Sequence, residues 1–287
     1  EVLTYQQLSG NSTYHILLLD ELLNMLPKSS LFAVPAVEIY YNIVMTLLYR
    51  NERHYFDTLM CLLEVHLASF EFDEGITMYS AALNYCIHQI NKGNFEFRTK
   101  ILDLYRMGLA TKLLFDGKYL SPWNYKNIVT IGLQTKEFEW VKSVLHEYKD
   151  AMRKQFRENA FTYNLANYHF YRGEYDEVLG LLQKVVYDDV FYSFDARAML
   201  LKIYYMQGAS NSLESLLESF RQYLMRNKTL SNKRKLTYKN LIRLTKKMVH
   251  LNRYDKEKVA ELKQEIFTAK SVAHKSWLVT QAKAIDA

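Results

Sequence analysis

Side chains that could do chemistry are present in this sequence, but they do not form a catalytic or metal-binding pattern. Cys86 and His88 are two residues apart and Cys61 and His66 are five apart, and on a helix neither spacing directs both side chains to one point. The HExxH, CxxC, GxxxxGK and GxSxG patterns do not occur in the 287 residues, and each of those chemistries depends on its spacing. We therefore expect no catalytic residue, no metal site and no cofactor, and we predict that the protein is not an enzyme.

Two adjacent carboxylates, Asp188 and Asp189, fall in an expected turn between helices. Neighbouring carboxylates can perform general acid–base chemistry. In a turn they can instead cap the following helix, because a carboxylate accepts hydrogen bonds from the free N–H groups of the first helical turn. Capping is the interpretation that we favour for this pair.

The positive charge of the sequence is concentrated in one segment. The formal net charge is +6, yet residues 221–258 hold 13 Lys or Arg and two acids, whereas the rest of the chain holds 24 basic and 29 acidic residues. Such a patch can bind nucleic-acid phosphates or an acidic protein surface, although a charge run is usually a solvated face. We expect positions 233–235 to lie in or near a loop. The basic-patch candidates are Lys233, Arg234, Lys235, Lys246 and Lys247.

Composition and periodicity predict an all-helical chain. Only nine Gly and three Pro occur, and 49% of the residues are hydrophobic, which suits long helices with short links around a continuous core. The most apolar stretch, residues 31–49, contains Pro, Glu and Asn and is too polar to span a membrane. Cys61 and Cys86 lie in apolar helical pattern, so we expect buried free thiols and a cytoplasmic location. Turn signals and apolar periodicity place helices near residues 14–26, 36–50, 54–69, 73–91, 95–115, 122–134, 138–151, 159–171, 175–187, 194–206, 211–226, 236–250, 255–269 and 276–284.

Two stretches of the sequence echo one another. Residues 159–190 and 194–223 each contain an apolar helix, a glycine turn and a second apolar helix, and the turn glycines Gly173 and Gly208 lie 35 residues apart. This period with this content marks a stacked helical repeat. We predict an all-α, right-handed superhelix of about six antiparallel helix pairs, with a leading helix and a C-terminal capping helix. Residues 1–116 would form less regular repeats and residues 117–287 more regular ones, in one continuous solenoid.

The repeat that starts at Asn159 carries residues typical of a known family at six positions: Leu165 at position 7, Ala166 at 8, Gly173 at 15, Tyr175 at 17, Leu182 at 24 and Val185 at 27. On such residues the stretch 122–269 resembles tetratricopeptide repeats, and the sequence as a whole resembles tetratricopeptide-like proteins of Bacteroidetes-type bacteria. Position 20 departs from the Ala that the family prefers, since it holds Val141, Val178 and Leu213. Larger residues there must widen the helix spacing or change the crossing angle.

The resemblance implies a non-enzymatic scaffold or adaptor whose first helices line a concave groove for a peptide or protein segment. Asn amides can bond both sides of a peptide backbone, and Lys and Arg can bind carboxylates, so the implied partner is acidic or carboxylate-bearing. The polar residues could instead be ordinary surface and the rings ordinary packing. The alternative function is a nucleic-acid-associated or regulatory factor that uses residues 221–258. The groove candidates are Lys126, Asn127, Tyr163, Asn164, Asn167, Tyr171, Lys202, Tyr205, Lys239 and Arg243.

Overall fold

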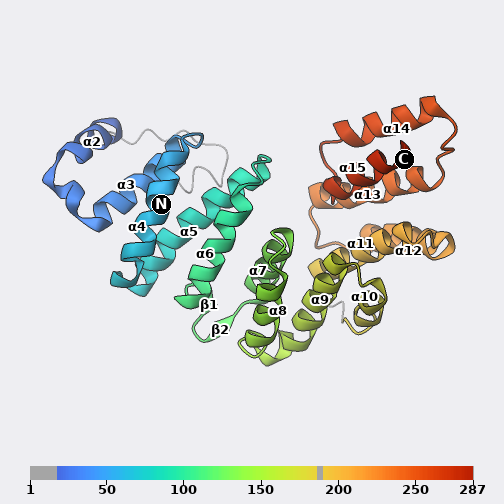
Figure 1. Cartoon of the computed structure of the whole chain (residues 1–287), viewed down its shortest axis with the longest axis horizontal. Helices are drawn as coiled ribbons and strands as arrows, with labels where there is room; N and C mark the ends of the chain where they lie inside the picture. The colour runs from blue at the N-terminus through green and yellow to red at the C-terminus, as the bar shows by residue number, and fades with distance from the viewer. Residues whose placement is uncertain (1–17, 186–189, 287) are drawn as a thin grey trace. The chain divides into compact units, whose positions relative to one another are not determined.

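The computed structural model describes residues 18–185 and 190–286, and most of them are helical (Figure 1). The chain divides into two compact units, unit 1 (residues 1–164) and unit 2 (residues 165–287), which are described separately. The helices are α2 (Leu19–Met25), α3 (Pro35–Leu48), α4 (Arg53–His66), α5 (Phe72–Asn91), α6 (Phe97–Ala110), α7 (Pro122–Gln134), α8 (Phe138–Glu147), α9 (Lys154–Arg172), α10 (Tyr175–Leu182), α11 (Val190–Met206), α12 (Ser210–Arg226), α13 (Asn232–Val249), α14 (Lys256–Thr268) and α15 (Lys275–Lys283).

The all-α class predicted from the sequence is confirmed. Helix α7 has its predicted limits because its local signals are strong, whereas α9 begins at Lys154 instead of residue 159 and α6 ends at Ala110 instead of residue 115. The Ser121 side chain accepts a hydrogen bond from the Asn124 N–H at 3.1 Å, and Pro122 occupies the first position of α7, where its missing N–H costs nothing. Gly173 and Gly208 follow α9 and α11 with φ angles of 79° and 66°, a conformation that glycine adopts without strain. The superhelical arrangement and its right-handedness remain predictions.

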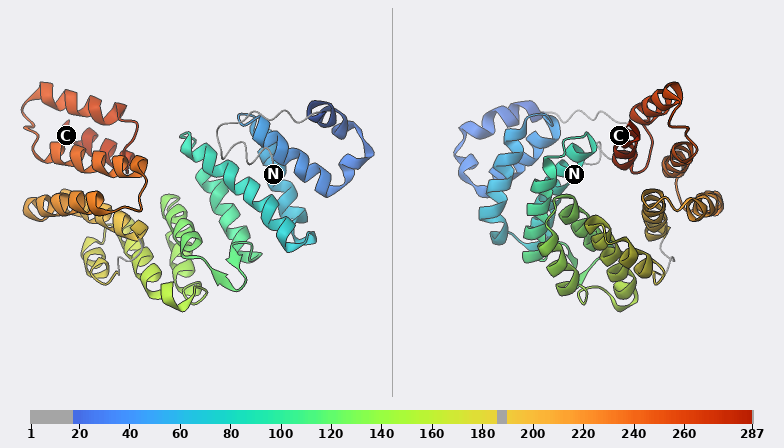
Figure 2. Two further views of the ribbon diagram at one scale, coloured as in Figure 1. Left: turned by 180° about the vertical axis from the view of Figure 1, so that it is seen from behind. Right: turned by 45° about the vertical axis from the view of Figure 1, so that its right-hand side comes forward.

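In unit 1, successive helices pack on one another (Figure 2). The helices α3 and α4, α5 and α6, and α7 and α8 are in contact, and α5 also contacts α3 and α4 while α6 contacts α7. A turn at residues 117–118 closes a two-stranded antiparallel ribbon of β1 (Phe115–Asp116) and β2 (Tyr119–Leu120). Short links between contacting helices thus organise the unit.

Buried tyrosine hydroxyls join two of these helix pairs. The Tyr79 hydroxyl of α5 donates to the Leu104 carbonyl of α6 at 2.9 Å. Gly108 makes this approach possible, because a Cβ atom there would lie 2.5 Å from the Tyr79 oxygen. The Tyr125 hydroxyl of α7 donates in the same way to the Leu145 carbonyl of α8 at 2.8 Å. A buried phenol needs a hydrogen-bond partner, and here the partner is the backbone of the adjoining helix.

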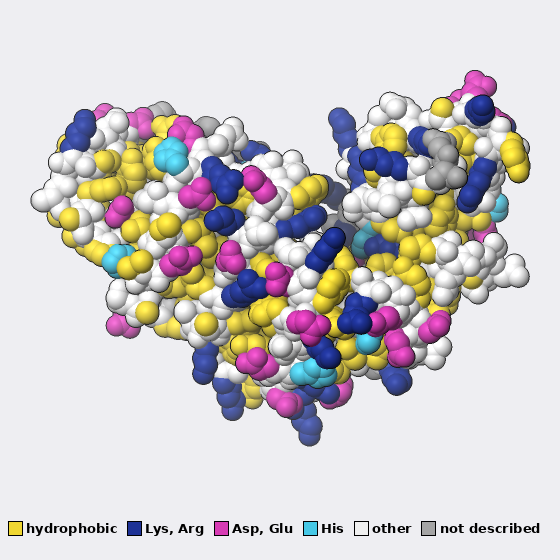
Figure 3. All heavy atoms as spheres, in the orientation of Figure 1, with side chains coloured by type: hydrophobic (Ala, Val, Ile, Leu, Met, Phe, Trp, Pro, Cys, Tyr) yellow, Lys and Arg dark blue, Asp and Glu magenta, His cyan; other side chains and the backbone are white. Residues whose placement is uncertain are grey.

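Charged side chains add links along the surface of unit 1. Arg53 of α4 reaches Glu96 at 3.2 Å, and Arg106 of α6 reaches Glu137 at 3.1 Å. The Arg106 guanidinium also lies 5.2 Å from the centre of the Trp140 ring in α8. The surface around α2–α4 exposes several large hydrophobic side chains, and Figure 3 shows hydrophobic side chains over these helices.

Unit 2 is built around one hydrophobic cluster shared by several helices. Phe194 of α11, Phe220 of α12 and Tyr238 of α13 meet with ring centroids 5.2 to 6.0 Å apart. The buried side chains Leu278 and Ala282 of α15 belong to the same cluster, so the last helix covers the core as the predicted capping helix would.

One local expectation was wrong, and one helix begins earlier than predicted. Residues 233–235 lie in the first turn of α13, which begins at Asn232 because the Ser231 side chain accepts a hydrogen bond from the Arg234 N–H at 3.3 Å. Cys86 is buried as expected, but Cys61 is exposed. Leu59, Met60 and Leu63 take the buried face of α4, which turns position 61 toward solvent.

Candidate binding surfaces

A groove with basic walls runs between α12 and α13 in unit 2. It has a volume of about 390 Å³, and none of its six lining residues is acidic. Met225 is 63% exposed, whereas Ile242 is only 6% exposed, so the groove offers an apolar strip rather than a uniformly charged surface. The groove is lined by Arg221 and Met225 of α12 and by Lys239, Ile242, Arg243 and Lys246 of α13.

Three of the four groove cations already have acidic neighbours. Arg221 binds Glu218 through two hydrogen bonds of 3.1 and 3.0 Å, and Lys246 lies 3.8 Å from Glu214. Arg243 forms an ion pair with Glu265. All of these charged groups are partly exposed, and exposed ion pairs contribute little free energy. A competing anion can therefore replace the acidic neighbours at small cost.

Lys239 differs from its neighbours. Its side chain is exposed and forms no ion pair or hydrogen bond with any residue in the described ranges 18–185 and 190–286. Its ammonium is the cation most available to an incoming acidic group.

The remaining predicted basic residues divide between the two ends of α13. Lys247 joins Arg243 at Glu265, with its Nζ atom 2.8 Å from a carboxylate oxygen. The Lys247 hydrogen bond, with a smaller effect of Arg243, keeps the pKa of Glu265 below its usual range. Lys233, Arg234 and Lys235 occupy the first turn, which holds no acidic residue. Cations are unfavourable there because the N-terminal end of a helix is the positive end of its dipole.

In unit 1, the predicted groove residues differ in how accessible they are. Asn127 is exposed on α7, and the Lys126 ammonium lies 5.3 Å from the centre of the Tyr163 ring. Tyr163 is buried, and Asn164 is fully buried. The Asn164 side chain donates to the Ala160 carbonyl of its own helix at 2.8 Å. Its amide is therefore committed to α9 and not presented to a peptide.

In unit 2, the predicted groove residues do not form one surface. Asn167 is 8% exposed, whereas Tyr171 is exposed with its ring edge-on to Phe170. Lys239 and Arg243 line the α12–α13 groove. Lys202 instead points to His274, just before α15, with 3.0 Å between its Nζ atom and the His274 Nδ1 atom.

Lys202 has an unusual environment. Burial lowers the pKa of its ammonium to about 8, and the nearby Asp195 carboxylate only partly opposes this effect. The ammonium also lies 5.5 Å from the centre of the Phe170 ring. Because it is held among α9, α11 and His274, Lys202 is a partly buried polar contact within unit 2 rather than an open anion-binding residue.

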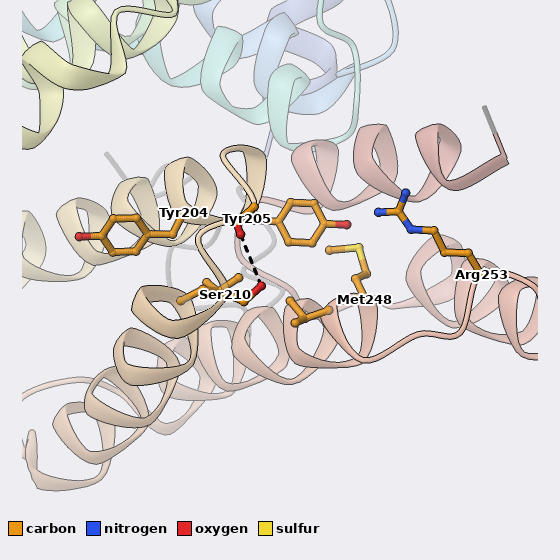
Figure 4. Close-up of a pocket in the computed structure, with 8 residues that line it drawn as sticks. Tyr204, Tyr205, Ser210, Met248 and Arg253 are labelled. Carbon is orange, nitrogen blue, oxygen red and sulfur yellow. Dashed lines mark hydrogen bonds between the residues drawn. The ribbon is translucent and has the colours of Figure 1, made fainter.

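A smaller hollow lies at the other end of the α12–α13 contact. Its volume is about 160 Å³, and Tyr205, Met248 and Arg253 converge on it from three elements (Figure 4). Tyr205 was predicted as a groove anchor; its ring also packs edge-on against Trp277 at 5.5 Å.

Sequence reasoning missed Arg221, Met225 and Ile242 as groove residues. The spacing of Lys239, Arg243 and Lys246 already indicates one face of α13. The opposite wall is on a different helix, and its contribution depends on the packing of α12 on α13.

Metal-binding clusters and membrane-spanning helices were also considered within the described residues. Residues 18–185 and 190–286 contain no group of three His, Cys, Asp or Glu side chains that could hold a metal ion. In the same ranges, no helix has both the length and the apolar character that crossing a bilayer requires. Asp188 and Asp189 lie outside the described residues.

Comparison with known proteins found no match to a family model, to a curated protein or to a solved structure.

Proposed function

We propose that this chain is a non-enzymatic helical-repeat protein that binds an acidic segment of another protein in the α12–α13 groove. The observation that carries the proposal is the combination of four cations, no acidic lining residue and an apolar floor of Met225 and Ile242. The proposal includes the tetratricopeptide-like arrangement, the scaffold role and the cytoplasmic location expected from the sequence.

The groove chemistry suggests how such a segment binds. From Lys239 to Lys246 the helix α13 advances about 10 Å, a length that two turns of a partner helix can match. An apolar side chain of the partner would cover Met225 and Ile242 and supply most of the buried apolar area. Its carboxylates would first meet Lys239 and then replace Glu218 and Glu265 at the two arginines, which can bind a carboxylate through two hydrogen bonds.

Charge reversal in the groove tests this function. The probe is a fluorescein-labelled amphipathic helical peptide of Glu and Leu, with its binding followed by fluorescence anisotropy. We expect the Lys239→Glu/Arg243→Glu double variant to weaken binding at least tenfold, because two attractive contacts become repulsive. The matched control is Lys256→Glu on the exposed start of α14, outside the groove, and it should change binding less than twofold.

A second comparison separates the apolar contribution from charge. Met225→Ser removes exposed apolar area without changing the net charge, and we expect it to weaken peptide binding about threefold to tenfold. If the folded wild type, the double charge variant and Met225→Ser all bind the peptide with equal affinity, the groove is not the binding site.

The first turn of α13 favours a second function, nucleic-acid binding. Lys233, Arg234 and Lys235 are placed where the helix dipole disfavours cations, and nearby phosphates would offset this cost. Single-stranded RNA and duplex DNA are the probes. Phosphate contacts predict an affinity that falls steeply with salt and is lost in a Lys233→Glu/Arg234→Glu/Lys235→Glu variant. If nucleic-acid affinity is the same in this variant and in the wild type, the second function is excluded.

A further inference from the structure

The hollow beside the end of α13 combines an apolar floor with two polar groups at its rim. Leu213 and Met248 are buried, and Val249 is partly buried beside them. The hydroxyl of Ser210 contacts the Gly208 carbonyl at 3.4 Å, which Figure 4 marks with a dashed line. That hydroxyl is therefore already engaged, and the other polar side chains that line the hollow are Tyr204, Tyr205 and Arg253.

Tyr205 and Arg253 approach the hollow from opposite sides. In Figure 4 the phenolic oxygen of Tyr205 is directed toward the Arg253 guanidinium, with Met248 beside the ring. Within residues 18–185 and 190–286, neither side chain forms a hydrogen bond or an ion pair with another residue. Burial raises the pKa of Tyr205, and the charge of Arg253 only partly opposes the rise. The phenol therefore keeps its proton at neutral pH and can act as a donor.

Two donors above an apolar floor match one kind of ligand. A carboxylate placed between them can accept one hydrogen bond from the Tyr205 O–H and one or two from the Arg253 guanidinium. A short apolar chain attached to that carboxylate would contact Met248, Leu213 and Val249. The volume of about 160 Å³ is below the usual range of pockets for drug-sized ligands and suits a small ligand group.

We propose that this hollow binds a carboxylate carried by a short aliphatic group. The site is separate from the proposed acidic-segment groove, because the two share no lining residue. The same chemistry is available from two sources, a free short-chain carboxylic acid and the C-terminal residue of a peptide.

The fluorescence of Trp277 offers a direct test, since its ring lies 5.5 Å from the Tyr205 ring. In a Trp123→Phe/Trp140→Phe variant, Trp277 is the only tryptophan. Titration with 4-methylpentanoate should give a saturable change, with a dissociation constant in the millimolar range for so small a ligand. The neutral control, 4-methylpentanamide, should bind at least tenfold more weakly. The second source is tested with acetyl-Gly-Leu as the free acid and as its amide.

Variants of the two donors complete the test. Arg253→Gln should weaken binding of the acid at least tenfold and Tyr205→Phe about threefold to tenfold. Arg226→Gln, an exposed position outside the hollow, should leave binding unchanged. The methyl resonance of Met248 in selectively labelled wild-type protein gives a second readout that needs no tryptophan substitution.

Each result decides between explanations. Binding of the free acid alone indicates a small metabolite, and binding of the peptide acid alone indicates a chain end; both agree with the proposed chemistry. The proposal fails if neither acid perturbs Trp277 or Met248, if the amides bind as well as the acids, or if Arg253→Gln binds as the wild type does.

Discussion

In unit 1, tyrosine hydroxyls join neighbouring helices by reaching a backbone carbonyl, whereas in unit 2 the Tyr238 hydroxyl reaches the Asp195 carboxylate of another helix. Rings from three helices meet in both units, and in unit 1 these are Phe56, Tyr85 and Phe97. Tyr79 and Tyr125 each connect the two helices of a single pair. Phe194, Phe220 and Tyr238 belong to α11, α12 and α13 and contact one another. Loss of a hydroxyl–carbonyl bond should destabilise one helix pair, whereas loss of a ring shared by three helices should destabilise all three. Both candidate binding surfaces lie in unit 2.

Among these substitutions, loss of the Phe220 ring should lower the stability most. Phe220 is fully buried, and we expect Phe220→Ala to lower the free energy of unfolding of unit 2 by about 3–5 kcal/mol through lost burial and a cavity. Trp277 fluorescence during urea unfolding reports unit 2 when Trp123 and Trp140 are replaced by Phe. Phe267→Ala, at a position 40% exposed, should cost less than about 1 kcal/mol. Similar effects of the two substitutions would contradict the shared-cluster account.

Two glycine substitutions test the close packing beside the Tyr79–Leu104 hydrogen bond of unit 1. A Cβ atom at Gly108 would lie 2.5 Å from the Tyr79 oxygen, and one at Gly180 would meet nothing within 4 Å. Gly108→Ala should therefore destabilise unit 1 by about 1–3 kcal/mol, whereas Gly180→Ala in α10 should stabilise unit 2 by about 0.5–1 kcal/mol. Trp123 and Trp140 report unit 1 in a Trp277→Phe variant. Effects of the same sign at both positions would refute this reasoning.

The partly buried Lys202 of unit 2 predicts a pH dependence of stability that exposed lysines lack. Its pKa is about 8 in the folded protein, and near 10.4 in the unfolded chain. Between these values the unfolded state holds more protons, so the free energy of unfolding should rise with pH, by roughly 2 kcal/mol across the window. The groups that face its ammonium are His274 and Asp195.

Comparison of variants isolates this contribution from other titrations. Lys202→Met should abolish the rise of the free energy of unfolding with pH and should be more stable than the wild type at neutral pH. Lys239→Met, at an exposed position, should keep the rise. Urea unfolding at pH 7, 8.5 and 10 measures the difference. Parallel pH profiles for wild type and Lys202→Met would show that the ammonium is not desolvated.

The smallest effect is expected at a surface link of unit 1. Arg106 contacts Glu137 at 3.1 Å and Asp103 at 3.5 Å, and all three side chains are more than 40% exposed. Arg106→Gln should cost less than about 1 kcal/mol, and the cost should shrink as salt screens the charges. Urea unfolding at low and high salt checks this; a large, salt-independent loss would indicate that the guanidinium acts through its packing on Trp140.

The helices could be predicted from the sequence because their limits depend on local chemistry. Ser121, Pro122, Gly173 and Gly208 act within a turn of their own positions, and each is readable without tertiary information. The first turn of α13 was missed because its three cations resemble a loop, although the cap of Ser231 was available as a signal.

The candidate site was less predictable. A repeat register assigns a face to Asn164, but it does not reveal that the amide bonds the carbonyl one turn earlier and is fully buried. The basic face of α13 follows from the spacing of Lys239, Arg243 and Lys246. The opposing Arg221 and Met225 do not, because a groove between two helices exists only once their packing is known.

The close approach of Tyr79 to Gly108 has a consequence for how this chain can evolve. A Cβ atom at position 108 would lie 2.5 Å from the Tyr79 oxygen, 2.8 Å from its Cζ atom and 2.8 Å from the Leu114 Cγ atom, so a methyl group becomes tolerable there only after the ring at position 79 has been replaced or moved and Leu114 has shifted. Among descendants of this sequence, positions 79, 108 and 114 should therefore covary, with a larger residue at 108 accompanied by smaller side chains at 79 and 114.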